Sequence, residues 1–168
     1  MSKAFTKEDD GPEGDRLPDL PQSPHPNYVT PAGLSTLRDR LTQRRSELAT
    51  LQADGDAIAT RQPIAVAQRD IRFLEERINR AVLVDPATHP EGIVAFGAEV
   101  DVLDDDDTPH RYRIVGEDEA DPAQGLIAPF SPLATALLGA EVGDVVDWTK
   151  PGGVVSLEIT SILFPDAA

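Results

Sequence analysis

Two carboxylates near the middle of the chain have the residue type and spacing that could support hydrolytic chemistry. Asp54 and Asp56 flank Gly55 in the segment Ala53-Asp54-Gly55-Asp56-Ala57. Such a pair could share a divalent cation with a site on another protein and orient a water molecule for attack. Carboxylates in a turn also act as caps and turn formers, which is the more common reason to find them there. The local sequence leaves both interpretations open.

Heptad ladders on either side of these carboxylates predict the elements that position them. Apolar residues recur with the alternating spacing of three and four that aligns side chains along one seam of a coiled coil. The first ladder comprises Leu34, Leu37, Leu41, Arg44, Leu48 and Leu51, and the second comprises Ile64, Ala67, Ile71, Leu74, Ile78 and Ala81. We therefore predict a coiled-coil hairpin of two antiparallel helices over residues 28–85, with the two aspartates at its tip.

Capping signals predict where the two helices begin and end. Thr30 is a suitable N-cap before Pro31, so the first helix should run from Pro31 to about Ala53. Pro63 would occupy the first position of the second helix, which we expect to end near Val82. Each arm would then measure roughly 30 Å.

Arginine is the only basic residue between positions 28 and 85. The interleaved Asp and Glu residues indicate local ion pairs on a solvated helix face, which is the favoured interpretation. Exclusive use of arginine would also suit a face that contacts phosphates. Arg44 interrupts the first ladder, where we expect its stem to follow the seam and its head to reach water. The candidates for lying near nucleic acid are Arg44, Arg45, Arg69 and Arg72.

The distribution of charge argues against autonomous binding to DNA. The 168-residue chain has a formal net charge of -15, and residues 86–168 contain 3 Lys/Arg against 16 Asp/Glu. A phosphate backbone would repel so acidic a surface, so RNA or DNA should be met only through a partner. The chain has no cysteine, its histidines lack metal-ligand spacing, and the run Asp104–Asp107 is best explained as a solvated turn. We therefore predict no resident metal or cofactor.

The remainder of the chain divides into a tail, a linker and a second domain. Residues 1–27 are acidic, proline-rich and poor in aliphatic side chains, so we expect a disordered tail. Residues 86–91 form a linker with two prolines. Residues 92–168 alternate short strand patterns with turns around one helix, which predicts an α+β domain with an antiparallel sheet. We see neither a membrane-length apolar run nor a secretion signal, so we expect a cytoplasmic protein.

Four segments of the second domain carry a family pattern. Residues 112–121 read YRIVGEDEAD, and residues 131–139 read SPLATALLG. The segments GDVV at 143–146 and PGG at 151–153 follow in the same order. These segments resemble the Gre family of bacterial transcription elongation factors (GreA/GreB), and the resemblance covers about residues 28–164.

The resemblance implies an FKBP-like C-terminal domain without prolyl isomerase activity. In the family this domain docks on bacterial RNA polymerase at the mouth of the secondary channel, and the hairpin enters the channel. We expect a monomer that is no enzyme of its own, holds no cofactor and does not bind a membrane. The residues expected to contribute to docking are Asp118, Glu119, Asp121, Ser131 and Pro132.

The tip departs from the family pattern. The family motif resembles G-D-L-x-E-N-A-E-Y, and its acids help magnesium held by the polymerase to activate water, so that backtracked RNA is cut. Gly55 and Asp56 match the start of the motif, whereas Ala59 and Thr60 stand where it has its glutamate and asparagine. Each arm is also shorter than the family pattern by about one heptad, which is roughly 10 Å of reach.

Two functions follow from the resemblance. In the first, the protein stimulates cleavage, with Asp56, alone or together with Asp54, helping the polymerase to hydrolyse RNA. In the second, it binds the channel without cleavage and modulates the polymerase or competes with other channel factors, as the resemblance to short-hairpin relatives such as Rnk suggests. A free-standing adaptor would leave the matched C-terminal segments unexplained. We favour polymerase binding with regulation of elongation and leave cleavage open.

Overall fold

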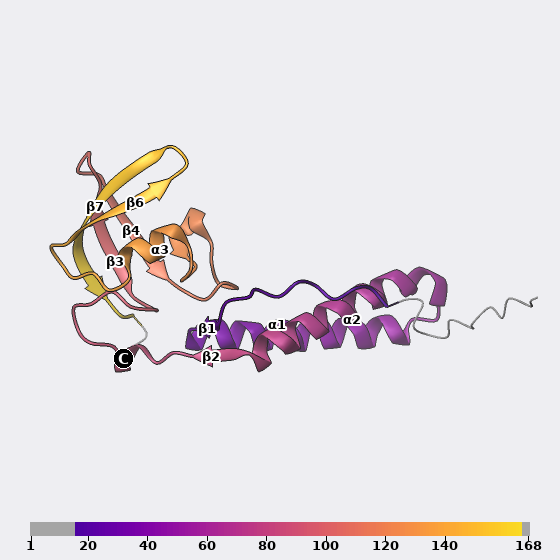
Figure 1. The fold of residues 1–168 in the computed structure, drawn as a ribbon. Helices are drawn as coiled ribbons and strands as arrows, with labels where there is room; N and C mark the ends of the chain where they lie inside the picture. Colours follow the sequence, from indigo (N-terminus) through magenta and orange to yellow (C-terminus); the bar gives the residue numbers. More distant parts are fainter. Residues whose placement is uncertain (1–15, 166–168) are drawn as a thin grey trace, which may run out of the picture. The chain divides into compact units, whose positions relative to one another are not determined.

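The computed structural model describes residues 16–165 and divides them between two compact units (Figure 1). The first unit contains residues up to Gln22 together with Asp39–Glu76. The second contains Ser23–Arg38 together with the chain from Arg77 onward. The two long helices therefore pass from one unit to the other, and each unit is described separately.

The first unit is the outer part of a helical hairpin, formed by α1 (Pro31–Ala53) and α2 (Ala57–Asn79). We call residues 39–76 the shaft. Only three residues connect the two helices, and the Arg45 guanidinium lies 2.7 Å from the Glu75 carboxylate, so the two arms run side by side in opposite directions. The ladder positions Leu41, Leu48 and Leu51 are partly buried between exposed neighbours. The predicted hairpin and its seam are confirmed.

Helix α1 has the boundaries that capping predicts, but α2 does not. The Thr30 hydroxyl accepts a hydrogen bond from the Gly33 N–H at 2.9 Å, as an N-cap should. Helix α2 begins at Ala57, so the prediction of a start at Pro63 is wrong. Asp56 caps this earlier start, and Pro63 lies inside the helix. The helix also ends at Asn79, before Val82, because the chain then forms a strand.

The stretch before the hairpin differs from the predicted disordered tail. Residues 1–15 lie outside the described residues, but residues 16–26 follow the shaft and hairpin base without forming a helix or strand. Strand β1 (Asn27–Val29) then pairs in parallel with β2 (Ala81–Leu83). Composition suggested too little apolar surface for order, but Leu17 and Leu20 are partly buried here.

The second unit contains an α+β domain, as predicted, but its sheet is mixed. The strand order is β5-β4-β3-β7-β6, and β5 runs parallel to β4 whereas the other pairs are antiparallel. Short 3-10 helices at Pro86–Thr88 and Pro122–Gln124 complete the unit. The strands are β3 (Glu99–Leu103), β4 (Pro109–Ile114), β5 (Leu126–Ile127), β6 (Val145–Lys150) and β7 (Gly153–Leu163).

Helix α3 (Pro132–Leu137) closes the core of this domain. Leu133, Ala134 and Leu137 are buried in one apolar cluster with sheet residues such as Val100 and Ile159. Burying each large aliphatic side chain contributes about 1.5–3 kcal/mol. Within residues 16–165, no helix is long and apolar enough to cross a membrane.

Candidate functional site

The hairpin tip uses both of its aspartates as backbone caps. The Asp54 Oδ1 accepts a hydrogen bond from the Asp56 N–H at 3.1 Å. The Asp56 Oδ1 accepts from the N–H groups of Ile58 at 3.2 Å and Ala59 at 3.0 Å. These bonds satisfy donors that the start of α2 would otherwise leave unpaired. Capping therefore accounts for both side chains without a cation.

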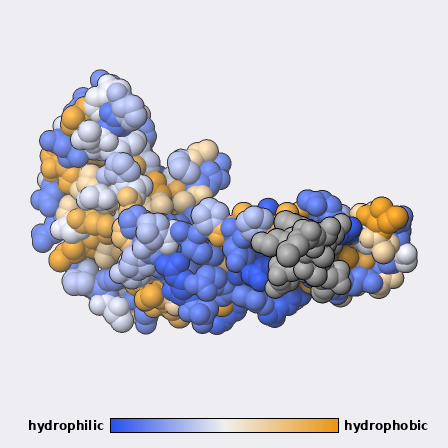
Figure 2. Space-filling model, turned by 45° about the vertical axis from the view of Figure 1, so that its right-hand side comes forward, coloured by the Kyte–Doolittle hydropathy of each residue, from blue (hydrophilic) through white to orange (hydrophobic). Residues whose placement is uncertain are grey.

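The surface of the tip is apolar where the family pattern has acid. Figure 2 shows a hydrophobic patch at the end of the hairpin, where Ile58 is 90% exposed. Ala59 offers a methyl group at the position of the motif's glutamate. Over the described part of the chain, no group of three or more His, Asp or Glu residues could hold a metal ion.

All four arginines that were predicted to lie near nucleic acid have carboxylate partners. Arg44 lies 2.7 Å from Glu47 and 3.2 Å from Asp70, so its head pairs across the hairpin as well as along its own helix. The remaining pairs are Arg45 with Glu75 at 2.7 Å, Arg69 with Asp70 at 2.9 Å, and Arg72 with Asp19 at 2.5 Å. This arrangement supports the interpretation of local ion pairs. A phosphate contact would have to displace these carboxylates.

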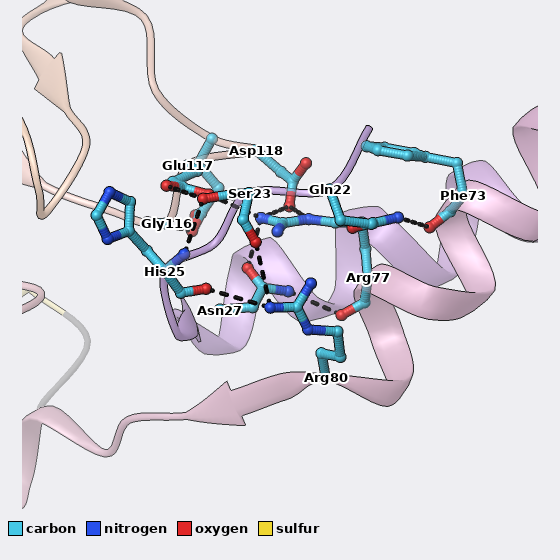
Figure 3. Close-up of polar contacts among 11 residues, drawn as sticks. Gln22, Ser23, His25, Asn27, Phe73, Arg77, Arg80, Gly116, Glu117 and Asp118 are labelled. Atoms are coloured by element: carbon cyan, nitrogen blue, oxygen red, sulfur yellow. Dashed lines mark hydrogen bonds and ion pairs between the residues drawn. The ribbon is translucent and has the colours of Figure 1, made fainter. Parts of the chain in front are cut away.

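A buried arginine organises the base of the hairpin in the second unit (Figure 3). The Arg77 side chain is only 3% exposed. Its Nε donates to Asp118 at 2.8 Å, and its Nη2 donates to the Asn27 side chain at 2.6 Å. The Asn27 amide in turn donates to the Arg77 carbonyl at 2.7 Å. A buried charge requires such partners because it has lost its water.

The neighbouring carboxylate, Glu119, continues this network to the start of α1. It accepts hydrogen bonds from the Thr30 hydroxyl at 2.6 Å and the Gly116 N–H at 3.1 Å. A Cβ at Gly33 would collide with the Glu119 carboxylate, so a larger residue here would force that carboxylate to move. We call Asn27, Thr30, Arg77, Asp118 and Glu119 the base network.

The five predicted docking residues therefore fall into different places within the second unit. Asp118 and Glu119 belong to the base network, where they bind the chain itself. Asp121 exchanges backbone hydrogen bonds with Leu126 at 2.9 and 3.0 Å, before β5. Ser131 and Pro132 start α3: the Ser131 hydroxyl donates to the Ala128 carbonyl at 2.7 Å and accepts from the Ala134 N–H at 3.3 Å. Nothing in the sequence distinguished Arg77 from Arg69, Arg72 and Arg80 on the same predicted helix, although the acidic loop at residues 117–121 was visible.

Ser131 and Pro132 also border an apolar pocket of about 430 Å³. Its walls include Tyr112, Leu133 and Trp148, with Lys150 at the rim. The Tyr112 and Trp148 rings meet edge to face at 6.4 Å, and the Lys150 ammonium lies 4.6 Å from the Trp148 ring. Burial, with a smaller contribution from the charge of Asp104, raises the pKa of Tyr112, so its phenol stays neutral. The pocket is suited to an aliphatic or aromatic side chain.

Comparison with known proteins finds matches that cover most of the chain. Residues 89–164 match the family described as "Transcription elongation factor, GreA/GreB, C-term". Transcription elongation factor GreA of Nautilia profundicola is 43% identical over 121 residues, which are 71% of this chain and 75% of the relative. Transcription elongation factor GreB of Neisseria meningitidis serogroup B is 37% identical over 151 residues, covering 81% and 93% respectively.

The chain belongs to the GreA/GreB family of transcription elongation factors. A solved structure with similarity to the chain is the prokaryotic transcription elongation factor GreA/GreB from Nitrosomonas europaea. It is 22% identical, with a TM-score of 0.41, and the match covers 82% of this chain and 99% of that one.

Proposed function

We propose that this chain binds RNA polymerase at its secondary channel and regulates elongation, with weak or absent stimulation of RNA cleavage. The observation that carries this proposal is the tip, where both aspartates cap backbone N–H groups and Ala59 replaces the second acid of the family motif. RNA and DNA are met only within the elongation complex, because a chain of net charge -15 is repelled by free nucleic acid. Any magnesium near the tip belongs to the polymerase.

The apolar pocket beside Ser131 and Pro132 is the proposed docking surface. It offers buried aromatic and aliphatic walls, and burying one Leu-sized side chain there would contribute about 1.5–3 kcal/mol. Anchors of this kind, held in a central apolar pocket, dominate the affinity of most interfaces. Asp118 and Glu119 support docking only indirectly, because they are already engaged in the base network.

Two variants in α3 test this docking surface. Pro132→Asp places a charge at the pocket rim, and folding should survive because an acid is favourable in the first turn of a helix. Thr135→Asp adds the same charge to an exposed position of α3 that does not line the pocket. We expect Pro132→Asp to weaken binding to core RNA polymerase by about tenfold or more, whereas Thr135→Asp binds like wild type. Equal affinity of all three proteins would refute the docking surface.

The short hairpin favours a second candidate, a non-cleaving modulator or a competitor of other channel factors, as in Rnk-like relatives. A carboxylate that bridges to a catalytic metal has to meet ligand distances of 2.0–2.6 Å, whereas each arm lacks roughly 10 Å of reach. A competition assay distinguishes this role: the chain should suppress cleavage stimulated by a full-length Gre factor in proportion to its occupancy of the polymerase. No suppression at saturating concentration would rule out the competitor.

A further inference from the structure

The segment that precedes the hairpin base lies in a groove on the shaft. Residues 16–22 read RLPDLPQ, so leucine and proline each recur with a period of three. An extended proline-rich chain has about three residues per turn, which places Leu17 and Leu20 on one side. In the structure these two leucines are partly buried, while Pro18, Asp19 and Pro21 are exposed.

Polar contacts fix the direction of this segment on α2. The Arg72 Nε donates to Asp19 at 2.5 Å, and its Nη2 donates to the Leu17 carbonyl at 2.9 Å. The Gln22 amide donates to the Phe73 carbonyl at 3.3 Å. Leu20 lines a groove of about 330 Å³ together with Arg40, Gln43, Arg44, Asp70, Phe73 and Leu74. Both arms of the shaft therefore contribute to one peptide-binding surface.

The contacts that hold residues 16–22 on the shaft are weak enough to break. The Asp19 side chain is 61% exposed, and water screens such an ion pair so that it contributes little to stability. The groove retains free volume beside Leu20, and the Gln22 Oε1 is buried without a hydrogen-bond partner among the described residues. A segment held so loosely stays in place mainly because the chain tethers it close to its groove.

We propose that residues 16–22 are an intramolecular strap that occupies a peptide-binding groove on the shaft and competes with RNA polymerase for the hairpin. The competition rests on the proposed function; the occupancy of the groove does not. The strap adds a third chain segment to the two helices of the shaft. It is also continuous with residues 1–15, which carry five carboxylates against two lysines. The added width opposes entry of the shaft into a confined channel, and the negative charge opposes entry into a channel that holds RNA.

Occupancy can be measured with a single fluorescent label, since the chain has no cysteine of its own. Position 21 of the strap is exposed, so Pro21→Cys provides a thiol to which a bimane dye is attached. Phe73→Trp places a quencher of this dye in the groove. The same dye without Phe73→Trp is the reference. We expect quenching in the full chain, and we expect Leu20→Asp to abolish it. The matched control Pro18→Asp adds the same charge at an exposed strap position and should remain quenched.

Binding of unlabelled chains to core RNA polymerase tests the competition. We expect Leu20→Asp to bind about three- to tenfold more tightly than wild type, and Pro18→Asp to bind like wild type. Asp19→Asn, which keeps the shape of the anchor without its charge, should give a smaller gain. Absence of quenching in the full chain would overturn the strap. Loss of quenching in Leu20→Asp without a gain in affinity would overturn the competition.

The quenching and binding measurements together distinguish failure of the competition from failure of the proposed function. If neither wild type nor any variant binds polymerase, the proposed function and the competition both fail. Quenching would still report whether the strap occupies its groove. If wild type binds and Leu20→Asp binds no better, the proposed function stands and the competition fails.

Discussion

Arg77 binds the acidic loop at residues 117–121 to the base of the hairpin. Its guanidinium is buried and bonded to Asp118 and Asn27, so the loop carboxylate is a partner within the chain. Removing one member of a buried pair leaves the other charge without compensation. The hairpin base therefore accounts for the carboxylates of Asp118 and Glu119, before any partner is considered.

The substitution Arg77→Met should destabilise the protein by about 3 kcal/mol, because Asp118 loses its charged partner and Asn27 loses a hydrogen bond. The matched change Arg45→Met removes an exposed pair with Glu75 and should cost less than about 1 kcal/mol. Urea unfolding followed by circular dichroism measures both. Equal losses would show that the base network contributes no more than a surface pair.

Gly33 provides a second test of the same network. Alanine normally stabilises a helix relative to glycine by about 1 kcal/mol, yet here its Cβ would collide with Glu119. We expect Gly33→Ala to lower the thermal unfolding temperature, and Glu119→Ala in the same chain to restore part of the loss. Gly55→Ala, which meets no atom within 4 Å, is the control and should be tolerated. A more stable Gly33→Ala protein would contradict the close contact.

Asp19 should report strap docking through its titration. The hydrogen bond from Arg72 holds the pKa of Asp19 below its usual value. A carboxyl with a lowered pKa favours the docked state above its ordinary pKa, and this contribution is lost as pH falls through the lowered value. We therefore expect the strap to loosen in acid. Carboxyl NMR should show the low pKa in wild type and a return toward the ordinary value in Arg72→Gln; an unchanged value would argue against the contact.

At the scale of elements, the sequence predicts best where a period and a cap agree. Helix α1 has the predicted bounds because Thr30 caps it and the ladder fills its seam. Helix α2 begins earlier than Pro63 predicted, because Asp56 caps a start at Ala57. Strands β1 and β2 escaped prediction because three residues are too few to show a period and their pairing spans more than fifty positions.

The candidate site was predictable in part. The tip acids and the Ser131–Pro132 cap were visible as local patterns, and the structure shows their hydrogen bonds. The partners of Asp118 and Glu119 were not visible in the sequence. Asp118 meets Arg77, and Glu119 meets Thr30, only after folding brings distant segments together. The strap was missed for a different reason: average composition conceals two leucines that share one side of an extended chain.

The cap at α2 gives a prediction at the scale of this element. Asp56→Ala should destabilise the protein by about 1 kcal/mol, because the N–H groups of Ile58 and Ala59 lose their acceptor. Asp56→Asn should cost much less, since asparagine caps equally well. Helical circular dichroism during thermal unfolding measures the difference. Similar losses in both variants would mean that charge matters at Asp56 more than capping does.

At the scale of the whole molecule, the two units differ in charge and in the surfaces that they offer to a partner. The second unit offers an apolar pocket on an acidic domain, which suits a protein partner and repels free nucleic acid. The first unit offers a rod whose arginines are paired and whose tip is capped and apolar. In the proposed function the first unit occupies the channel, and the second unit supplies the affinity.

Cleavage of RNA in a stalled, backtracked elongation complex tests the central claim most directly. The measurement compares saturating wild type with Asp56→Asn, which keeps the cap and removes the charge. We expect wild type to add little to the intrinsic cleavage rate of the polymerase, and we expect Asp56→Asn to behave like wild type. Rapid cleavage by wild type that disappears in Asp56→Asn would contradict this expectation and assign a catalytic role to the tip.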